Sequence, residues 1–487
     1  MPSTPFFAAW RPQLAPLRGR TAKTLRQVRA YTLCKLETCL APWVPADLFP
    51  KAAKKENSRD CEYTRWRTFW CMLWHSLNPG SSGREVVRQL QAAILLEQGP
   101  LISENDGAYC RAKARLPLQE FPKALTATAQ AARQQVTTST ALQGRPVKAI
   151  DGSAITLPDT KKNRKVYPPL QCADRPSFPM LRLVVLFCLA SGAILASAQG
   201  SLAVSELSLF DALLSQLVSG DILLGDRGFG CFPVLALLQA AGIDFLGRTP
   251  RRVDGRRRRK RLAKNDWLVC WHRSPTPSPW LSLKRWAGLP EELTLRVVKG
   301  RCHQKGFRVR QVTLVTTLLD PKLYPAAEIL QAYLRRWRLE MCLDDLKTTL
   351  KLDLLRSQSP AMAQKEVYTR LIAHNLVRCI MAQAATEQNV ALERISFKGS
   401  LDALRHFSQA QAGARTRKQR REIWAEFLRT LAADLVPERP GRREPRAVKR
   451  KKRKYPRLNT PRHQFRDHLK RNTRRKLARL RKLGLVM

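Results

Sequence analysis

Several absences narrow the class of this 487-residue chain before any motif is considered. Twelve cysteines are present, but no two of them form a CxxC pair, which argues against zinc ribbons and against a disulfide framework. They are most simply interpreted as free thiols in a reducing cytoplasm. The sequence also contains nothing that resembles a phosphate-cradling P-loop or a Ser-His-Asp constellation.

Long hydrophobic runs are missing as well. The N-terminus lacks the basic-then-apolar order of a signal peptide. The uncharged run LVVLFCLASGAILASA (183–198) is shorter than the roughly 20 residues that span a bilayer, and Ser191-Gly192 interrupts it. We interpret this run as two buried strands joined by a tight turn. The sequence therefore predicts a cytoplasmic protein with no membrane partner.

Acidic residues are scarce: 38 Asp and Glu face 88 Lys and Arg, which leaves a net charge of +50. Residues 441–487 alone hold 20 basic and 2 acidic residues, a balance of +18. Such a surplus favours a polyanionic partner, and nucleic acid is the first choice. An anionic membrane surface is the competing polyanion. A ribosomal or histone-like role would also fit the charge, but such proteins are usually much shorter.

The chain divides by composition into five segments. Residues 1–140 are expected to be helical, and their last short helix carries Tyr109 within a basic stretch. Either a helix-turn-helix-like DNA reader or a plain helical bundle fits this part. Strand-rich sequence follows, and it resumes after a Pro- and Trp-rich stretch that we interpret as a β-rich insertion. The expected boundaries are 1–140 (helical, DNA-binding), 145–226 and 312–395 (two parts of an α/β core), 227–311 (insertion) and 396–487 (basic C-terminal region).

One polar stripe stands out on a predicted helix that begins near Ala326. On a helical wheel at about 100° per residue, a stripe roughly 60° wide contains Tyr333, Arg336, Glu340 and Lys347. Apolar residues border it on one side at Leu339, Leu343, Leu346 and Leu350, and on the other at Leu334, Trp337 and Met341. The remaining face, expected to meet solvent, holds Arg335, Arg338, Asp345 and Thr349.

This stripe has a simple structural interpretation, an Arg336–Glu340 ion pair one turn apart, worth a few tenths of a kcal/mol. That interpretation leaves unexplained why the pair lies between apolar bands, where an unpaired carboxylate is costly. Asp344 falls near the same stripe, so the wheel alone does not single out Glu340.

Two aspartates have a matching placement. Asp151 lies within KAIDGS on an apolar strand, and Asp226 follows another strand in LLGDRGFG. Either aspartate alone is most simply interpreted as a turn former. Three nearby aspartates are also candidates for a catalytic acid: Asp159, Asp221 and Asp244. Strand-end acids on neighbouring strands can nevertheless converge, and a helix packed across the sheet can add Glu340. Three carboxylates are what two Mg²⁺ ions need for in-line phosphodiester chemistry.

These residues resemble a known family. Y-(2)-R-(3)-E-(6)-K is the signature of the insertion-sequence-four family of bacterial DDE transposases, and the four stripe residues match it at every spacing. IDGSAITLPDT and GDRGF resemble the segments around that family's first and second catalytic aspartates. The resemblance covers about residues 148–357. It implies a ribonuclease-H-like core interrupted by a β-rich insertion, with a helical N-terminal domain and a basic C-terminal tail.

By the same resemblance, the chain is expected to catalyse Mg²⁺-dependent cut-and-paste transposition through DNA hairpin intermediates. Asp151, Asp226 and Glu340 would hold two Mg²⁺ ions, for which Mn²⁺ can substitute. The DNA backbone beside a flipped base would be gripped by Tyr333, Arg336 and Lys347. The expected partners are double-stranded DNA, as terminal inverted repeats and as target, and a second copy of the chain in the DNA complex. The expected location is the bacterial cytoplasm, at the nucleoid.

One departure from the family concerns a tryptophan that relatives carry at the start of the strand before the signature helix. Here Val312 or Thr313 stands at that place. Trp337 remains within the signature. An aromatic residue of the insertion, Trp286 or Phe307, is a further candidate for stacking the extruded base. Two other functions stay open from the residues: a non-catalytic nucleic-acid-binding protein, and a ribonuclease-H-like nuclease without strand transfer.

Overall fold

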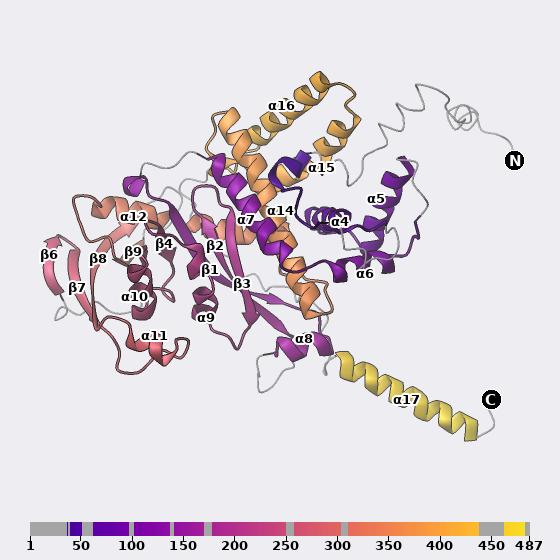
Figure 1. Cartoon of the computed structure of the whole chain (residues 1–487), viewed down its shortest axis with the longest axis horizontal. Helices are drawn as coiled ribbons and strands as arrows, with labels where there is room; N and C mark the ends of the chain where they lie inside the picture. The colour runs from indigo at the N-terminus through magenta and orange to yellow at the C-terminus, as the bar shows by residue number, and fades with distance from the viewer. Residues whose placement is uncertain are drawn as a thin grey trace.

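A single nine-stranded sheet forms the centre of the molecule (Figure 1), with strand order β3-β2-β1-β4-β5-β9-β8-β7-β6. The structure is a computed structural model, and it describes residues 37, 39–50, 62–96, 102–136, 141–169, 178–249, 258–302, 310–437 and 462–482. The strands are β1 (Val147–Thr156), β2 (Met180–Cys188), β3 (Ile194–Ser201), β4 (Ile222–Gly225), β5 (Asp244–Arg248), β6 (Arg258–Ala263), β7 (Asp266–His272), β8 (Glu292–Cys302) and β9 (Arg310–Thr316).

The strand segments predicted from the apolar runs are confirmed. The uncharged run 183–198 forms β2 and β3, and the turn between them contains Gly192 at φ +70°, a backbone conformation that suits glycine. Strands β1, β2 and β3 pair antiparallel, whereas β4 and β5 run parallel to β1. The helical segment α9 (Glu206–Asp211) lies between β3 and β4, as expected.

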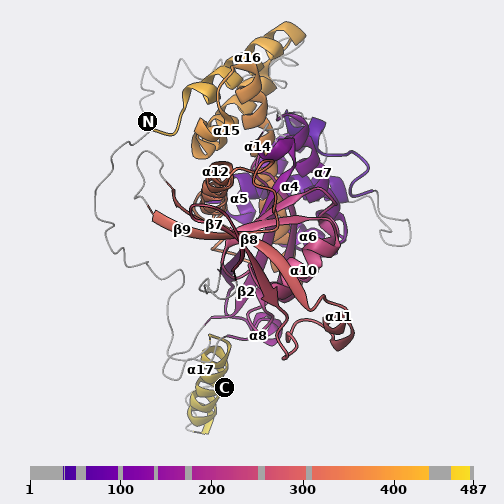
Figure 2. The same cartoon turned by 90° about the vertical axis from the view of Figure 1, so that its left-hand side faces the viewer.

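Successive side chains along each strand point to opposite faces of the sheet, so the hydrophobic core consists of two layers, one on each face. Ala149 of β1 and Leu224 of β4 belong to one apolar cluster, together with the signature helix and α14 (Pro360–Glu387). Their neighbours in sequence, Ile150 and Leu223, belong to a second cluster on the other face, with α9 and α10 (Phe232–Ala240). Helices therefore cover both faces of the sheet (Figures 1 and 2).

The described N-terminal helices pack as a bundle against α14 and the sheet (Figure 1). They are α4 (Arg65–Leu77), α5 (Gly83–Leu96), α6 (Gly107–Arg115) and α7 (Glu120–Gln134). Tyr109 is fully buried, so this residue of the basic helix α6 points into the bundle. His374 and Asn375 of α14 are also fully buried, which confirms them as packing groups. Asn375 ties β3 to α7 through hydrogen bonds with both backbone groups of Ile194 and with Leu125 O.

The additional strands extend the sheet instead of forming a separate unit. They begin later than the expected boundary at residue 227, because α10 and β5 follow Asp226 and continue the parallel part of the sheet. Strands β6, β7 and β8 then lead back to β9, which pairs with both β8 and β5. Trp286, on the short helix α11 (Leu283–Ala287), is buried in the core. Phe307 lies outside the described residues.

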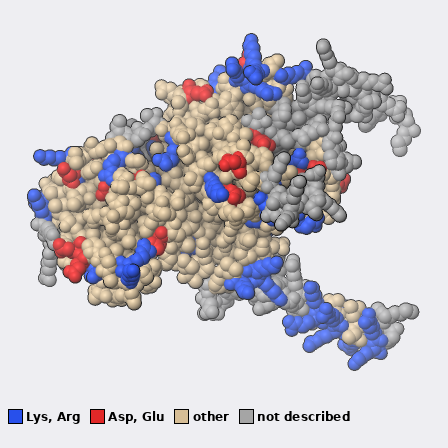
Figure 3. All heavy atoms as spheres, viewed as in Figure 1, with Lys and Arg blue, Asp and Glu red and all other residues tan. Residues whose placement is uncertain are grey.

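The first part of the basic C-terminal region is folded. Helices α15 (Phe397–Gly413) and α16 (Arg417–Ala433) pack on α14 at one end of the molecule (Figures 1 and 2). The basic helix α17 (Arg462–Lys482) projects at the opposite end. Lys and Arg side chains cover α17 and also gather near α8 (Lys161–Val166) and α16 (Figure 3). No helix in the described part of the chain is both long and apolar enough to cross a bilayer.

Candidate active site

The register of two central strands brings Asp151 and Asp226 together. In the parallel pair β1·β4, Val147 is opposite Ile222 and Ala149 is opposite Leu224. Continuing this register by two residues brings Asp151 opposite Asp226. Both aspartates also share the side-chain parity of Ala149 and Leu224, so they lie on the face of the sheet that the signature helix covers.

Each aspartate is oriented by backbone N–H groups. The Gly152 N–H donates to Asp151 Oδ1 at 2.8 Å. The Gly228 N–H donates to Asp226 Oδ1 at 2.8 Å, which forms the turn where β4 ends. These bonds use one oxygen of each carboxylate.

The signature segment is not the single straight helix that the wheel assumes. It consists of α12 (Ala326–Leu334), a turn at residues 335–336, α13 (Trp337–Asp344) and a π-helical turn, η6 (Asp345–Thr349). One predicted apolar band is confirmed, because its four members are buried: Leu339, Leu343, Leu346 and Leu350. The other flank is open instead, with Trp337 37% and Met341 41% exposed.

The face expected to meet solvent is covered, so that expectation is wrong. Arg338 pairs with Glu393 at 2.5 Å, and η6 contacts α14 and α15. Burial raises the pKa of Asp345 to about 7, while Arg378 of α14 acts in the opposite direction. The physical reason is that neighbouring helices, which a wheel does not contain, pack on this side.

Arg336 lies between Asp151 of β1 and Glu340 of α13. Its guanidinium is 2.6 Å from Glu340 Oε1 and 3.8 Å from Asp151 Oδ2, and it lies 5.9 Å from the ring centroid of Tyr333. Burial raises the pKa of Asp151 to about 6, and the nearby Asp226 and Glu206 carboxylates add to this rise, whereas Arg336 and the Gly152 N–H oppose it. Burial is therefore the main reason that Asp151 holds its proton more tightly, and the neighbouring carboxylates add to it.

The donor chemistry of this cluster suits a hard divalent cation, since three carboxylates offer only oxygen ligands. The carboxylate oxygens of Asp151, Asp226 and Glu340 do not all lie within 4.8 Å of one another in the described part of the chain. The Arg336 side chain stands between two of them and supplies the positive charge there. The remaining signature residue, Lys347, lies on η6 and is half-buried.

The rival aspartates have other partners. Asp221 pairs with Lys148 at 2.5 Å, Asp244 pairs with Arg145 at 2.6 Å, and Asp159 pairs with Arg164. Asp344 is exposed and accepts a hydrogen bond from Thr348. These pairs stabilise strand ends and helix turns. Asp151 and Glu340 are left as the acids beside Arg336, and Asp226 lies near Asp151.

Sequence reasoning missed one acid, Glu206. It begins α9, and its carboxylate lies against Gly152, where a Cβ atom would come within 2.6 Å of it. Glycine at position 152 thus leaves room for a fourth carboxylate beside Asp151. No sequence motif includes Glu206. The one available signal was Gly152, because a glycine directly after a candidate metal ligand often allows another group to pack closely against the backbone.

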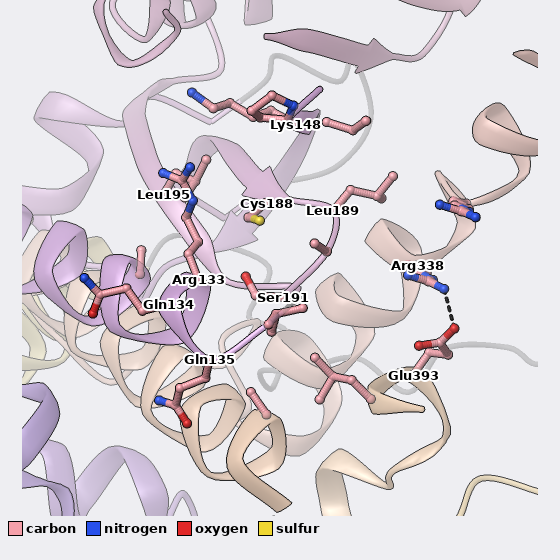
Figure 4. A pocket seen from close by; sticks show the side chains of 18 of the residues that line it. Arg133, Gln134, Gln135, Lys148, Cys188, Leu189, Ser191, Leu195, Arg338 and Glu393 are labelled. Atoms are coloured by element: carbon pink, nitrogen blue, oxygen red, sulfur yellow. Dashed lines mark hydrogen bonds and ion pairs between the residues drawn. The ribbon is translucent and has the colours of Figure 1, made fainter. Parts of the chain in front are cut away.

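A separate cavity of about 940 Å³ opens beside the start of β1, lined by α7, the β2–β3 turn and the signature segment (Figure 4). Five basic residues line it, and three of them have acidic partners: Lys148 with Asp221, Arg145 with Asp244, and Arg338 with Glu393. The last pair is drawn in Figure 4. This cavity is therefore a poorer anion site than the charges on its wall suggest.

Comparison with known proteins gives the class of this site. Residues 142–376, which include Asp151, Asp226 and Glu340, match the family described as "Transposase DDE domain".

Two individual proteins are similar to this chain. The transposase InsG of insertion sequence element IS4 from Escherichia coli (strain K12) is 28% identical over 401 residues, which cover 80% of this chain and 85% of that protein. A solved chain of the piggyBac transposase synaptic complex with hairpin DNA covers 87% of this chain and 88% of its own length, at 12% identity and a TM-score of 0.35. The match over residues 142–376 and the similarity to InsG are thus both to transposases.

Proposed function

We propose that this chain is a DDE transposase of the insertion-sequence-four family and that it performs Mg²⁺-dependent cut-and-paste transposition with Asp151, Asp226 and Glu340 as its catalytic acids. The observation that carries the proposal is that Arg336 bridges Asp151 and Glu340 while Asp226 lies near Asp151. Asp151 is on β1, Asp226 directly follows β4, and Glu340 is on α13. An assembly of acids with a raised pKa at Asp151 favours a bound cation, because a cation lowers the cost of their mutual repulsion.

Asp151, Asp226 and Glu340 would hold the ions through carboxylate oxygens. Two Mg²⁺ ions, or Mn²⁺ in their place, would supply activation of the attacking oxygen and stabilisation of the leaving oxygen. Before DNA binds, Arg336 neutralises Glu340 and Asp151 and so keeps the acids close together. In the DNA complex this guanidinium would turn to a phosphate, since phosphate offers it the same bidentate pairing as a carboxylate.

The other signature residues would grip DNA beside the acids. Tyr333 lies under the Arg336 guanidinium and can donate its hydroxyl to a phosphate, and Lys347 adds an ammonium group. Trp337 is exposed on the open flank of α13, which supports a role in stacking an extruded base. Val312 of β9 is buried, so Trp337 is our candidate for the stacking role in a hairpin route.

The sheet supports a ribonuclease-H-like core, because three antiparallel strands are followed by two parallel ones in the order β3-β2-β1-β4-β5. Strands β6–β8 would then be the insertion. We further propose that the N-terminal helical region recognises terminal inverted repeats and that the protein acts on DNA as a homodimer. The exposed Lys and Arg residues of α17 favour contact with the DNA backbone outside the active site.

A strand-cleavage assay tests the proposal. The substrate is a labelled duplex that carries the element's own terminal repeat, incubated with Mg²⁺ or with EDTA. Glu340→Gln should bind this duplex and fail to nick it. Asp344→Asn, the same kind of change at an exposed acid one turn along the segment, should cut like wild type. Equal cutting by Glu340→Gln and Asp344→Asn would rule out the assigned role of Glu340.

A further inference from the structure

Three side chains of types that bind metals, Cys270, His272 and Glu292, lie close together on one face of the β7·β8 pair. None of them belongs to the proposed catalytic site. His272 is directly opposite Glu292 in this antiparallel ladder, so their side chains share a face. Cys270 precedes His272 by two residues and therefore points the same way. Cys270 Sγ lies 3.1 Å from Glu292 Oε2, and His272 Nδ1 lies 3.9 Å from the same oxygen.

The spacing of these atoms is close to that of a tetrahedral zinc site. One ligand atom from each residue lies within 4.8 Å of the others, and no other group of three or more such residues in the described part of the chain meets this limit. Zn–S and Zn–N bonds of about 2.3 and 2.0 Å separate two ligands by roughly 3.5 Å. Small side-chain movements would therefore complete the geometry.

The ligand types also select the ion. A thiolate and an imidazole beside one carboxylate favour Zn²⁺ over Mg²⁺, which prefers oxygen ligands only. His272 and Glu292 have side chains 69% and 46% exposed, so an ion can enter from solvent, while Cys270 is buried at the base of the cluster.

We propose that Cys270, His272 and Glu292 bind one zinc ion, with a fourth position open to water. The Cys270 thiol loses its proton to solvent when the thiolate binds, so the affinity falls at low pH. The ion cross-links β7 to β8 at the end where the chain leaves for α11. Arg273, next to His272, already holds the segment around α11 in place, because it donates hydrogen bonds to the carbonyl oxygens of Trp286 and Leu289. The zinc ion thus stabilises the outer part of the sheet.

Cobalt binding to the full-length protein tests the site, with Co²⁺ as the probe. After removal of metals with EDTA, Co²⁺ should produce a thiolate-to-cobalt charge-transfer band that excess Zn²⁺ removes. The band should disappear in Cys270→Ser, and zinc affinity should fall at least tenfold in His272→Ala, whose exposed side chain can be removed without disturbing the core. Cys110→Ser, a change at an exposed cysteine on α6, should keep the band.

The catalytic acids contain no sulfur, so the band cannot arise from them, and its loss in Cys270→Ser but not in Cys110→Ser assigns it to this cluster. Asp226→Asn should keep the band in full even though it is expected to lose cleavage, which separates failure of the zinc site from failure of the proposed catalysis. Absence of the band in the wild-type protein, or its persistence in Cys270→Ser, would overturn the zinc assignment.

Discussion

Replacing Asp151 with asparagine should stabilise the protein at neutral pH. A pKa raised from 3.8 to about 6 means that the folded protein holds this proton more tightly than the unfolded chain does. The resulting stabilisation is fully present below about pH 4 and is lost as the pH rises through about 6. The pKa difference of about 2 corresponds to about 3 kcal/mol of unfolding free energy, and about half of it falls between pH 5 and pH 7.5.

The assay is the unfolding midpoint of wild type and Asp151→Asn measured across this pH range. The variant cannot ionise, so its stability should exceed that of wild type at pH 7.5, and the difference should shrink toward pH 4. Mg²⁺ should stabilise wild type at pH 7.5 more than the variant, because the ion offsets the negative charge of Asp151. Asp344→Asn is the matched control at an exposed acid. Parallel pH curves for wild type and Asp151→Asn would refute the reasoning.

Three further predictions concern packing, a buried ion pair and DNA. Gly300→Ala should destabilise the protein by about 1–3 kcal/mol, because a Cβ there would lie 2.3 Å from Leu330 of α12; adding Leu330→Ala should restore part of the loss in denaturant unfolding. Arg296→Met should cost about 3–5 kcal/mol in the same assay, because it leaves the buried Asp266 carboxylate without its partner at 2.6 Å, and a second change, Asp266→Leu, should recover most of it. Trp337→Ala should weaken binding of hairpin-ended DNA by about 1–3 kcal/mol in a titration, and Trp337→Phe should retain most of the affinity.

Much of the sheet was predictable, because apolar runs between turn residues specify strands locally. Asp151 and Asp226 could be singled out because each is an acid beside an apolar run and next to glycine, although Asp151 lies within β1 and only Asp226 follows the end of a strand. That they lie opposite each other depends on the parallel register of β1 and β4, which are separated by more than 60 residues of chain. Local patterns contain no information about such a pairing.

The errors arose where neighbours decide the outcome. The wheel assigned Arg338 and Asp345 to solvent because it contains neither Glu393, which pairs with Arg338, nor α14 and α15, which contact the η6 turn that holds Asp345. It also assumed a straight helix, whereas the turn at residues 335–336 ends α12 beside Arg336. The continuation of the sheet through β6–β8 is likewise a long-range pairing, so composition could indicate strands there without showing that they join the core.

The most direct test of the central claim is a structure of the protein bound to its terminal repeat DNA in the presence of Mn²⁺, with the ions located by anomalous scattering. The account predicts Mn²⁺ coordinated by carboxylate oxygens of Asp151, Asp226 and Glu340, with the Arg336 guanidinium moved from Glu340 to a DNA phosphate. If the 2.6 Å Arg336–Glu340 pair persists beside bound DNA and no ion contacts these acids, the assignment of this cluster as the catalytic metal site is contradicted.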